Sequence, residues 1–512
     1  MVIVYHQNNK VVEVQYDEKR IDFEKLNITK ALFKIANLYS DQLIIWCHID
    51  LKTNLNLSKL QEIFHHNKIM ASYNVSDSTY LSEAIGYVDG APFMKIKKDV
   101  RYPTWQMSSS VGGVHASVLL SFKGEIKESD NFDYFLNSLA KLAMPIGLLC
   151  YSEPAFLNDF SDKKANDKQS LYILFRFVKQ HYKVSWVFLL LLNLFLYEKK
   201  ITLLPFINSL FYRRRVLNND LLDSIKVQSS KKILEKGTID VIIPTIGRKK
   251  YLYDVLKDLS KQTHLPKKVI VVEQNPNPES TSELDYITDE NWPFAIKHIF
   301  THQAGACNAR NVALAEVDSE WVFLNDDDNR FGIDLIEKTL ENCIKYGSEV
   351  SSNFYPKINE ERKINLVNQA DFFGSGNSFI TSSLLDKVSF RMGFEFGYGE
   401  DSDFGMQMRN SGVDILYFPD PEIIHLSAPT GGFRTKPVLA WQNDVVQPKP
   451  SPTIMLFNLL HKTPEQINGY KSTLFFKFYK VQTIKNPIKY WSNFQKQWAQ
   501  SLYWANELKN KI

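Results

Sequence analysis

Three consecutive carboxylates follow a short apolar segment in the second half of the chain. Residues 321–324 (Trp-Val-Phe-Leu) have the pattern of a buried strand, and residues 325–329 read Asn-Asp-Asp-Asp-Asn. Three adjacent carboxylates repel one another, and burying them unpaired is costly, so such a cluster needs a cation. Oxygen ligands suit a hard ion, which predicts a Mg²⁺ or Mn²⁺ site here. The alternative is a solvated acidic turn or helix cap.

The acidic triplet stands within a longer alternation of predicted strands and helices. Apolar runs at 239–243 and 268–272 predict two further buried strands, with helical segments between the strands. This order predicts an α/β fold with a doubly wound, mostly parallel sheet. Polar residues follow the strand ends: Thr245, Arg248, Glu273 and the acidic triplet. Since ligands of open α/β sheets bind outside the carboxyl ends of the strands, we expect the binding site at this edge.

Length and composition exclude several classes of protein. A chain of 512 residues is too long for one ordinary core and predicts two or three domains. The net charge of only +4 does not indicate a nucleic-acid-binding protein. The four cysteines are far apart and lack metal-ligand spacing, which favours reduced thiols in the cytoplasm. The first residues lack a basic region followed by an apolar one, so no signal peptide is expected.

An apolar segment at residues 184–197 raises the question of membrane contact. Its 14 residues fall short of the roughly 20 that a membrane-spanning helix needs. Lys183 precedes it, Lys199 and Lys200 follow it, and three arginines stand at 213–215. Two interpretations remain open: a buried helix, or a helix that lies in the membrane interface with help from these cations.

Several motifs resemble family 2 glycosyltransferases with the GT-A fold, over about residues 238–435. They occur in that family's order: PTIGR (244–248), VEQN (272–275), GACNARN (305–311), NDDDN (325–329), GYGEDSD (397–403) and a late His425. The resemblance implies a nucleotide-sugar donor, most simply a UDP-sugar, and a divalent metal, Mn²⁺ or Mg²⁺. It also implies an inverting single displacement that transfers a hexosyl group.

The resemblance also implies roles for individual residues. Asp401 would be the catalytic base and Glu400 would hold the acceptor or orient the loop, while Asp328 and His425 would bind the metal. The residues expected to bind the nucleotide-sugar are Pro244, Thr245, Arg248, Glu273, Asn275, Arg310, Asn311, Asp326, Asp327 and Arg434. Three simpler interpretations remain: a helix N-cap for Asp401, a partly buried histidine for His425, and an internal salt bridge to the acidic strand end for Arg310.

The first part of the chain can be aligned with the second. Residues 42–50 parallel 320–328, so that a single acid of the triplet is retained, and Asn131 falls on Asp401. This alignment leaves no counterpart of the strand that ends in PTIGR. We therefore hypothesise that residues 1–160 are a truncated, catalytically inactive GT-A-like domain, because an amide cannot deprotonate a hydroxyl. The alternative is a chance match between generic α/β patterns.

The resulting organisation has four parts. We expect an α/β domain at 1–160, a helical apolar region at 161–236, the GT-A catalytic domain at 237–435 and a helical tail at 436–512. The expected function is transfer of a sugar to a glycan or lipid-linked acceptor in surface polysaccharide synthesis, with peripheral contact at the cytoplasmic face of the membrane. The alternatives are a nucleotidyltransferase of similar fold and a non-catalytic carbohydrate-binding scaffold.

Overall fold

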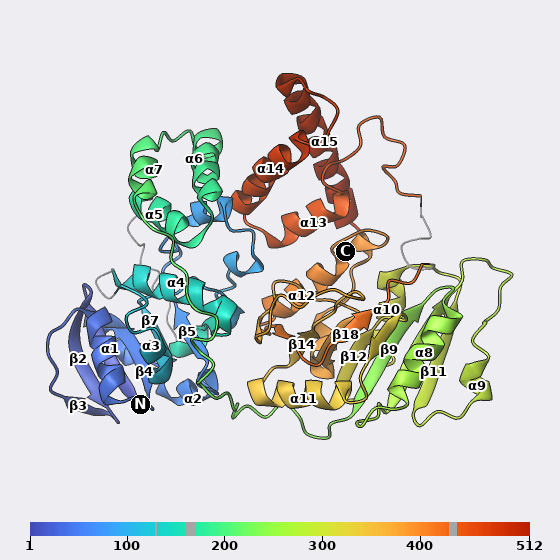
Figure 1. Cartoon of the computed structure of the whole chain (residues 1–512), viewed down its shortest axis with the longest axis horizontal. Helices are drawn as coiled ribbons and strands as arrows, with labels where there is room; N and C mark the ends of the chain where they lie inside the picture. The colour runs from blue at the N-terminus through green and yellow to red at the C-terminus, as the bar shows by residue number, and fades with distance from the viewer. Residues whose placement is uncertain (128–130, 159–169, 430–437) are drawn as a thin grey trace. The chain divides into compact units, whose positions relative to one another are not determined.

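The computed structural model of the chain describes residues 1–127, 131–158, 170–429 and 438–512. Within these ranges, helices alternate with strands in both halves of the chain (Figure 1). Among the residues described, no helix combines the length and the apolar character needed to cross a membrane.

The chain divides into two compact units. Unit 1 comprises Met1–Lys231 together with Lys462–Lys480, and unit 2 comprises Lys232–His461 together with Val481–Ile512. The tail at 436–512, which the sequence predicts as one helical segment, therefore contributes to both units.

Unit 2 is built on an eight-stranded mixed sheet. In spatial order its strands are β11 (Ala295–Thr301), β10 (Lys268–Gln274), β9 (Ile239–Thr245), β12 (Trp321–Asn325), β16 (Asn377–Thr381), β14 (Val350–Asn353), β17 (Leu416–Phe418) and β15 (Asn368–Gln369). Its helices are α8 (Lys249–Leu259), α9 (Tyr286–Asp289), α10 (Ala306–Leu314), α11 (Leu335–Tyr346), α12 (Glu400–Asn410), α13 (Pro452–His461) and α15 (Pro487–Lys509).

The centre of the unit 2 sheet follows the predicted parallel pattern. β9 pairs in parallel with both β10 and β12, and β10 pairs in parallel with β11. These central strands are almost wholly buried because Val, Ile, Leu and Phe occupy both faces of the sheet. β16 and β15 run antiparallel to their neighbours, so the sheet is mostly rather than entirely parallel.

A small two-stranded sheet lies beside the end of β12. It pairs β13 (Asn329–Phe331) with β18 (Ile423–His425), and Asn329 stands opposite His425. This pairing carries a histidine from late in the chain to the acidic triplet.

Unit 1 contains a second eight-stranded sheet. In spatial order its strands are β3 (Lys19–Ile21), β2 (Lys10–Tyr16), β1 (Val2–Gln7), β4 (Leu43–His48), β7 (Val111–His115), β5 (Ile69–Tyr73), β8 (Leu149–Ser152) and β6 (Tyr102–Pro103). Its helices are α1 (Ile28–Leu38), α2 (Leu60–Ile63), α3 (Ala116–Ser121), α4 (Phe132–Ala143), α5 (Leu171–His181), α6 (Val184–Glu198), α7 (Leu203–Leu210) and α14 (Pro464–Tyr479).

Six consecutive strands of the two sheets have the same order and the same sense. The series β1-β4-β7-β5-β8-β6 in unit 1 corresponds to β9-β12-β16-β14-β17-β15 in unit 2. In both series the successive pairings are parallel, antiparallel, antiparallel, parallel and antiparallel. The two units therefore share a topology that generic α/β alternation does not require.

The residue register of these strands also agrees. The Ala116 amide, just after β7, donates to the Gln42 carbonyl just before β4 at 2.9 Å. In unit 2 the Ser382 amide, just after β16, donates to the Glu320 carbonyl just before β12, also at 2.9 Å. These matched bonds fix the alignment of the two sheets residue by residue.

In this alignment most of the acidic triplet has no acidic counterpart in unit 1. His48 takes the place of Asp326, Ile49 takes the place of Asp327, and Asp50 alone corresponds to the last acid. The register predicted from the sequence for 42–50 against 320–328 is the register that the strand pairings give.

The first strand of unit 2 has a counterpart after all, so the expectation that unit 1 lacks one is wrong. β1 pairs in parallel with β4 as β9 does with β12. The chain then turns back at Asn8 and Asn9, which both have positive φ (51° and 59°), into the antiparallel strand β2. Asn tolerates this conformation, and a hairpin replaces the PTIGR loop and the helix after it.

The predicted match of Asn131 with the base also needs correction. Asn131 is the N-cap of α4 and accepts a hydrogen bond from the Asp133 amide at 3.1 Å. The amide and hydroxyl of Ser109 donate to the Asp133 carboxylate at 2.8 and 2.9 Å. Ser375, which aligns with Ser109, lies beside Asp401, where its amide and hydroxyl oppose the rise in pKa that burial causes. By these contacts Asp133 is the counterpart of the presumed base, so the acid is retained in unit 1.

Candidate active site

The loop after β9 meets the acidic triplet at one edge of the unit 2 sheet. Because β9 and β12 are parallel neighbours, their carboxyl ends lie side by side. The Thr245 hydroxyl donates to Asp327 Oδ2 and the Arg248 guanidinium to Asp327 Oδ1, each at 2.6 Å. Burial raises the pKa of Asp327 to about 6, against the opposing effects of Arg248 and Thr245. Asp327 thus joins the loop after β9 to the end of β12.

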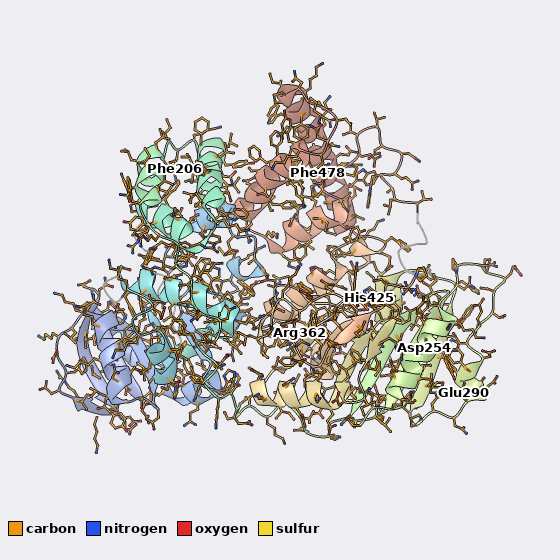
Figure 2. The ribbon with its side chains drawn as sticks, in the orientation of Figure 1. Phe206, Asp254, Glu290, Arg362, His425 and Phe478 are labelled. Atoms are coloured by element: carbon orange, nitrogen blue, oxygen red, sulfur yellow. The ribbon has the colours of Figure 1, made fainter. Side chains whose placement is uncertain are left out.

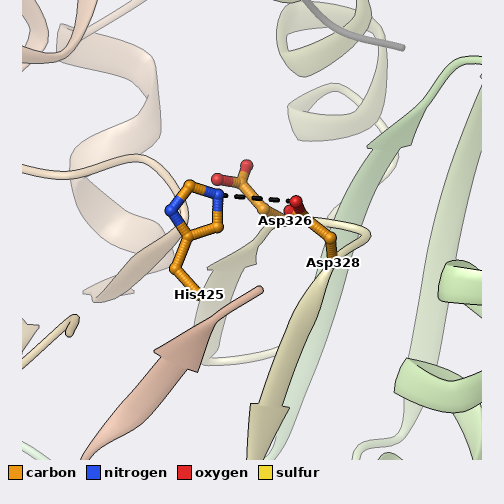
Figure 3. A group of neighbouring side chains, drawn as sticks. All are labelled: Asp326, Asp328 and His425. Atoms are coloured by element: carbon orange, nitrogen blue, oxygen red, sulfur yellow. Dashed lines mark ion pairs between the residues drawn. The ribbon is translucent and has the colours of Figure 1, made fainter. Parts of the chain in front are cut away.

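Asp326, Asp328 and His425 form a compact group next to this junction (Figure 3). One potential ligand atom of each residue lies within 4.8 Å of those of the other two. His425 Nε2 lies 3.5 Å from Asp328 Oδ2. Two carboxylates and an imidazole are a donor set that first-row divalent metals accept, Mn²⁺ more readily than Mg²⁺.

The protonation states of this group also suit a metal. Burial alone would raise the pKa of Asp328, but His425, the Ala428 amide at 2.7 Å and Arg248 together hold it below its ordinary value. Asp328 in turn raises the pKa of His425. Asp328 Oδ1 is buried and receives no hydrogen bond from the described residues, and Arg248 lies 3.5 Å from it. A buried, ionised carboxylate with an unsatisfied oxygen fits the role of a metal ligand.

Asp326 is held from three sides. Arg310 donates to its Oδ1 at 3.1 Å, and the Tyr355 hydroxyl lies 3.0 Å from its Oδ2. The ring of Tyr355 also stacks on the imidazole of His425, with centroids 4.9 Å apart. A Cβ on Gly376 would lie 2.2 Å from Asp326 Oδ2, so only glycine leaves room for the carboxylate there. Tyr355 therefore positions both Asp326 and His425.

Glu400 and Asp401 occupy the first turn of α12, directly after Gly399 at φ 107°. Burial raises the pKa of Asp401, and the positive charge of Arg310 opposes this rise. Burial and the neighbouring Asp401 raise the pKa of Glu400 to about 7. Asp401 Oδ1 is buried and has no hydrogen-bond partner among the residues described. A carboxylate in this position can accept a proton from a bound hydroxyl.

Arg310 connects the strand-end acids with the helix α12 acids. It forms the internal ion pair with Asp326 that the sequence left as an alternative. Burial lowers the pKa of Arg310, and the negative charges of Asp326, Asp401 and Glu400 outweigh that effect and raise it. The structure thus brings the acidic triplet, His425 and the Glu400–Asp401 pair into one site around a buried guanidinium.

Two of the expected nucleotide-binding residues have hydrogen-bond partners around the carboxyl end of β10. Glu273 accepts hydrogen bonds from the Ser282 hydroxyl at 2.5 Å and from His298 Nε2 at 2.9 Å. Asn275 Oδ1 accepts from the Asn277 amide at 3.1 Å, which shapes the turn after β10. Both residues stand at the carboxyl end of β10, where the sequence places them.

Of the remaining expected residues, Asn311 has a structural contact. Its side-chain amide exchanges two hydrogen bonds with the backbone of Phe390, at 2.7 and 2.9 Å. Pro244 lies in β9, one residue before Thr245. Arg434 lies outside the residues that the structure describes.

Sequence reasoning missed Tyr355 and Glu395. The Glu395 carboxylate accepts from the amides of Cys307 and Asn308 at 3.3 and 3.0 Å, at the start of α10. It therefore supplies the negative charge that this helix N-terminus favours. Neither residue belongs to a local motif, since each acts on a segment far away in the chain, and no spacing rule could have found them.

Comparison with known families matches the middle of the chain. The model of the family described as Glycosyl transferase family 2 matches residues 240–403. An uncharacterised glycosyltransferase of Rickettsia conorii is 28% identical over 151 residues. That match covers 29% of this chain and 24% of the relative, so the chain spans about a quarter of the relative's length.

Solved structures of S. aureus TarS are also similar to this chain. Residues 1–349 of TarS match with 16% identity and a TM-score of 0.36, covering 52% of this chain and 81% of TarS 1–349. The same fragment in complex with UDP-GlcNAc matches with 17% identity and a TM-score of 0.36, covering 52% and 79%. The family match is the finding that bears on identity: residues 240–403 match the model of glycosyl transferase family 2, which together with the named relative supports a family 2 glycosyltransferase.

Proposed function

We propose that this chain is an inverting, metal-dependent glycosyltransferase. It transfers a sugar from a nucleotide-sugar, a UDP-sugar in the simplest case, to a hydroxyl of a glycan or lipid-linked acceptor. The reaction contributes to the synthesis of a surface polysaccharide at the cytoplasmic face of the membrane. One observation carries the proposal: in a family 2 domain, a potential metal-ligand group and a buried carboxylate with an unsatisfied oxygen share one site around Arg310.

The donor would bind at the shared carboxyl ends of β9 and β12. Asp326, Asp328 and His425 would hold a divalent metal, which when bound neutralises the charge of the diphosphate leaving group. Arg248, fixed by Asp327, adds a second positive charge at the same strand ends.

In the proposed reaction, Asp401 takes the proton of the acceptor hydroxyl. The acceptor oxygen forms a bond to the anomeric carbon, and the bond from that carbon to the phosphate oxygen breaks on the opposite face. The hydroxyl proton passes to the Asp401 carboxylate, and the nucleoside diphosphate leaves with the bonding electron pair. Single displacement of this kind inverts the anomeric configuration.

A panel of donors tests the proposal. Thermal unfolding would be measured with UDP-, GDP- and dTDP-sugars, each with and without Mn²⁺. We expect one donor class to raise the melting temperature only when the metal is present, because only the bound state gains the ligand's free energy. No stabilisation by any donor with metal would contradict the proposal.

We further propose that unit 1 is a non-catalytic relative of the catalytic domain and serves as a scaffold. The shared strand order and register support this relationship. The β1–β2 hairpin replaces the loop that carries Arg248, and His48 and Ile49 replace two acids of the triplet. These replacements remove donor contacts, whereas the Asp133 carboxylate remains.

One donor site per chain is therefore expected. Isothermal titration of the full chain with UDP and Mn²⁺ should give a stoichiometry near one. Asp328→Ala should abolish this binding, while Asp50→Ala, its counterpart in unit 1, should leave it unchanged. A second binding event, or loss of binding in the Asp50 variant, would contradict the proposed inactivity of unit 1.

The pH dependence of transfer should reflect the paired carboxylates of α12. The base acts in its ionised form, so kcat/KM should fall as the pH falls through the raised pKa of Asp401. The acidic limb of the pH profile should therefore lie above the pKa of an ordinary aspartate, which is about 3.9. Glu400→Gln removes a neighbouring negative charge, which eases ionisation of Asp401 and should move this limb to lower pH. An unmoved limb would argue against coupling between the two acids.

A further inference from the structure

Helix α7 turns its apolar side outward. Leu204, Ile207 and Phe211, at helical spacing, are 70%, 50% and 84% exposed. Thr202 and Ser209, by contrast, are only 2% and 0% exposed. In a helix that packs on a protein core the apolar side is the buried one. The polarity of α7 is reversed, so its outer face lacks the environment that its side chains favour.

Helix α6 extends this apolar face. Phe188 and Phe195, seven residues apart on one side of the helix, are exposed. A neighbouring side of the helix is buried and holds Val187, Leu190 and Leu194. The Phe188 ring meets Phe206 of α7 edge-on, with centroids 5.0 Å apart. Figure 2 labels Phe206 among the side chains of unit 1. The outer sides of α6 and α7 are therefore continuous, and we call them the α6–α7 face.

Basic residues border this face in the sequence. The segment 183–216 contains six basic residues and one acidic residue, Glu198. Five of the basic residues are exposed: Lys183, Lys199, Lys200, Arg213 and Arg214. They stand before α6, between the two helices and after α7. An apolar surface with cations at its borders matches the two layers of an anionic bilayer surface, acyl chains below and phosphates above.

We propose that the α6–α7 face binds the interfacial layer of a membrane that contains anionic phospholipid. The aromatic and aliphatic side chains enter the boundary between headgroups and acyl chains, and the lysines and arginines contact the lipid phosphates. α6 has 15 residues, or about 22 Å of helix, which is shorter than the roughly 30 Å hydrocarbon layer. The helices therefore lie along the surface.

A lipid surface suits this face better than a second copy of the chain. A symmetric dimer through the face would place the same cationic border on both sides of the interface, where like charges repel. Phospholipid headgroups supply the opposite charge. The inference concerns binding alone and does not depend on the proposed transfer reaction, so either can fail without the other.

Vesicle flotation of the full chain tests the inference. One set of vesicles contains phosphatidylcholine alone, and the other contains phosphatidylcholine mixed with phosphatidylglycerol. We expect binding to the mixed vesicles and weak binding to phosphatidylcholine. Ile207→Ser combined with Phe211→Ser should reduce binding at least about tenfold, since two large exposed side chains lose their apolar contact. Arg213→Gln combined with Arg214→Gln should reduce binding to the mixed vesicles only.

Matched variants distinguish binding by this face from non-specific hydrophobic binding. Val445 and Ile488 are exposed apolar residues of unit 2, and Val445→Ser with Ile488→Ser should leave flotation unchanged. Circular dichroism would establish that each variant is folded. The inference is overturned if wild type fails to float with the mixed vesicles, or if the α6–α7 variants float as well as wild type. A dimer in light scattering that the Ile207 and Phe211 changes dissociate would also overturn it, because the occupant would then be a second copy.

Discussion

Asp401→Asn is expected to lower the rate of sugar transfer by between about 100-fold and 10,000-fold while donor binding stays unchanged. The substitution preserves the shape of the side chain at the start of α12 but removes its capacity to take a proton. Asp401 Oδ1 has no hydrogen-bond partner among the described residues, so an amide there breaks no bond of that oxygen. Initial rates at saturating donor and acceptor, with donor affinity measured separately, would check this prediction.

The chain offers a matched control for this variant. Asp133 is buried at the start of α4 and accepts from Ser109, as described for unit 1. Asp133→Asn should leave the transfer rate per folded molecule unchanged, because unit 1 lacks the donor contacts. If Asp401→Asn keeps full activity, another group is the base. If both variants lose activity alike, the assignment of catalysis to unit 2 alone is wrong.

Asp328→Ala is expected to eliminate metal-dependent donor binding. Charge stabilisation by a bound metal contributes several kcal/mol, which corresponds to at least about a hundredfold in donor affinity. One buried oxygen of Asp328 has no hydrogen-bond partner in the described part of the chain, so removal of this side chain should affect the metal more than the fold. Titration calorimetry with UDP in the presence of Mn²⁺, and electron paramagnetic resonance of Mn²⁺ alone, would measure the two affinities.

An exposed acid provides the comparison for Asp328. Asp318 precedes β12 at its opposite end and forms surface ion pairs with Lys267 and Lys268 at 2.9 Å. Asp318→Ala removes the same charge from the same sheet and should leave metal and donor affinity unchanged. Mn²⁺ affinity that survives in Asp328→Ala would show that the metal has other ligands.

The central strands of unit 2 could be predicted because their sequence leaves few alternatives. The apolar runs at 239–243, 268–272 and 321–324 correspond to β9, β10 and β12, whose observed ends lie at most two residues further on. Strands buried on both faces need continuous β-branched and aromatic residues, and the polar residues after them mark their ends. The same reasoning predicted that the acids lie at the carboxyl ends of these strands.

Contacts between distant segments could not be predicted in this way. Tyr355 follows β14, and its reach to Asp326 depends on the turn that the chain makes beyond the strand. Residues 184–197 left two interpretations open because α6 is apolar on all sides, so periodicity does not reveal which side is buried. The correspondence of β1 with β9 was not predicted, because a hairpin, not a helix, follows β1.

The path of α14 determines how the protein can be dissected. This helix comes after nearly all of unit 2 in the sequence, yet the Gln466 side chain donates to the carbonyls of Asp89 and Ala91 at 2.9 Å each. A fragment that stops at residue 231 would lack Gln466, so both carbonyls would lose this hydrogen-bond donor. It would also expose the backbone of Tyr87, against which Gly469 packs. Cutting the chain between the units would therefore yield an incomplete first half, and a fragment that joins residues 1–231 to 462–480 through a linker keeps all the segments of unit 1.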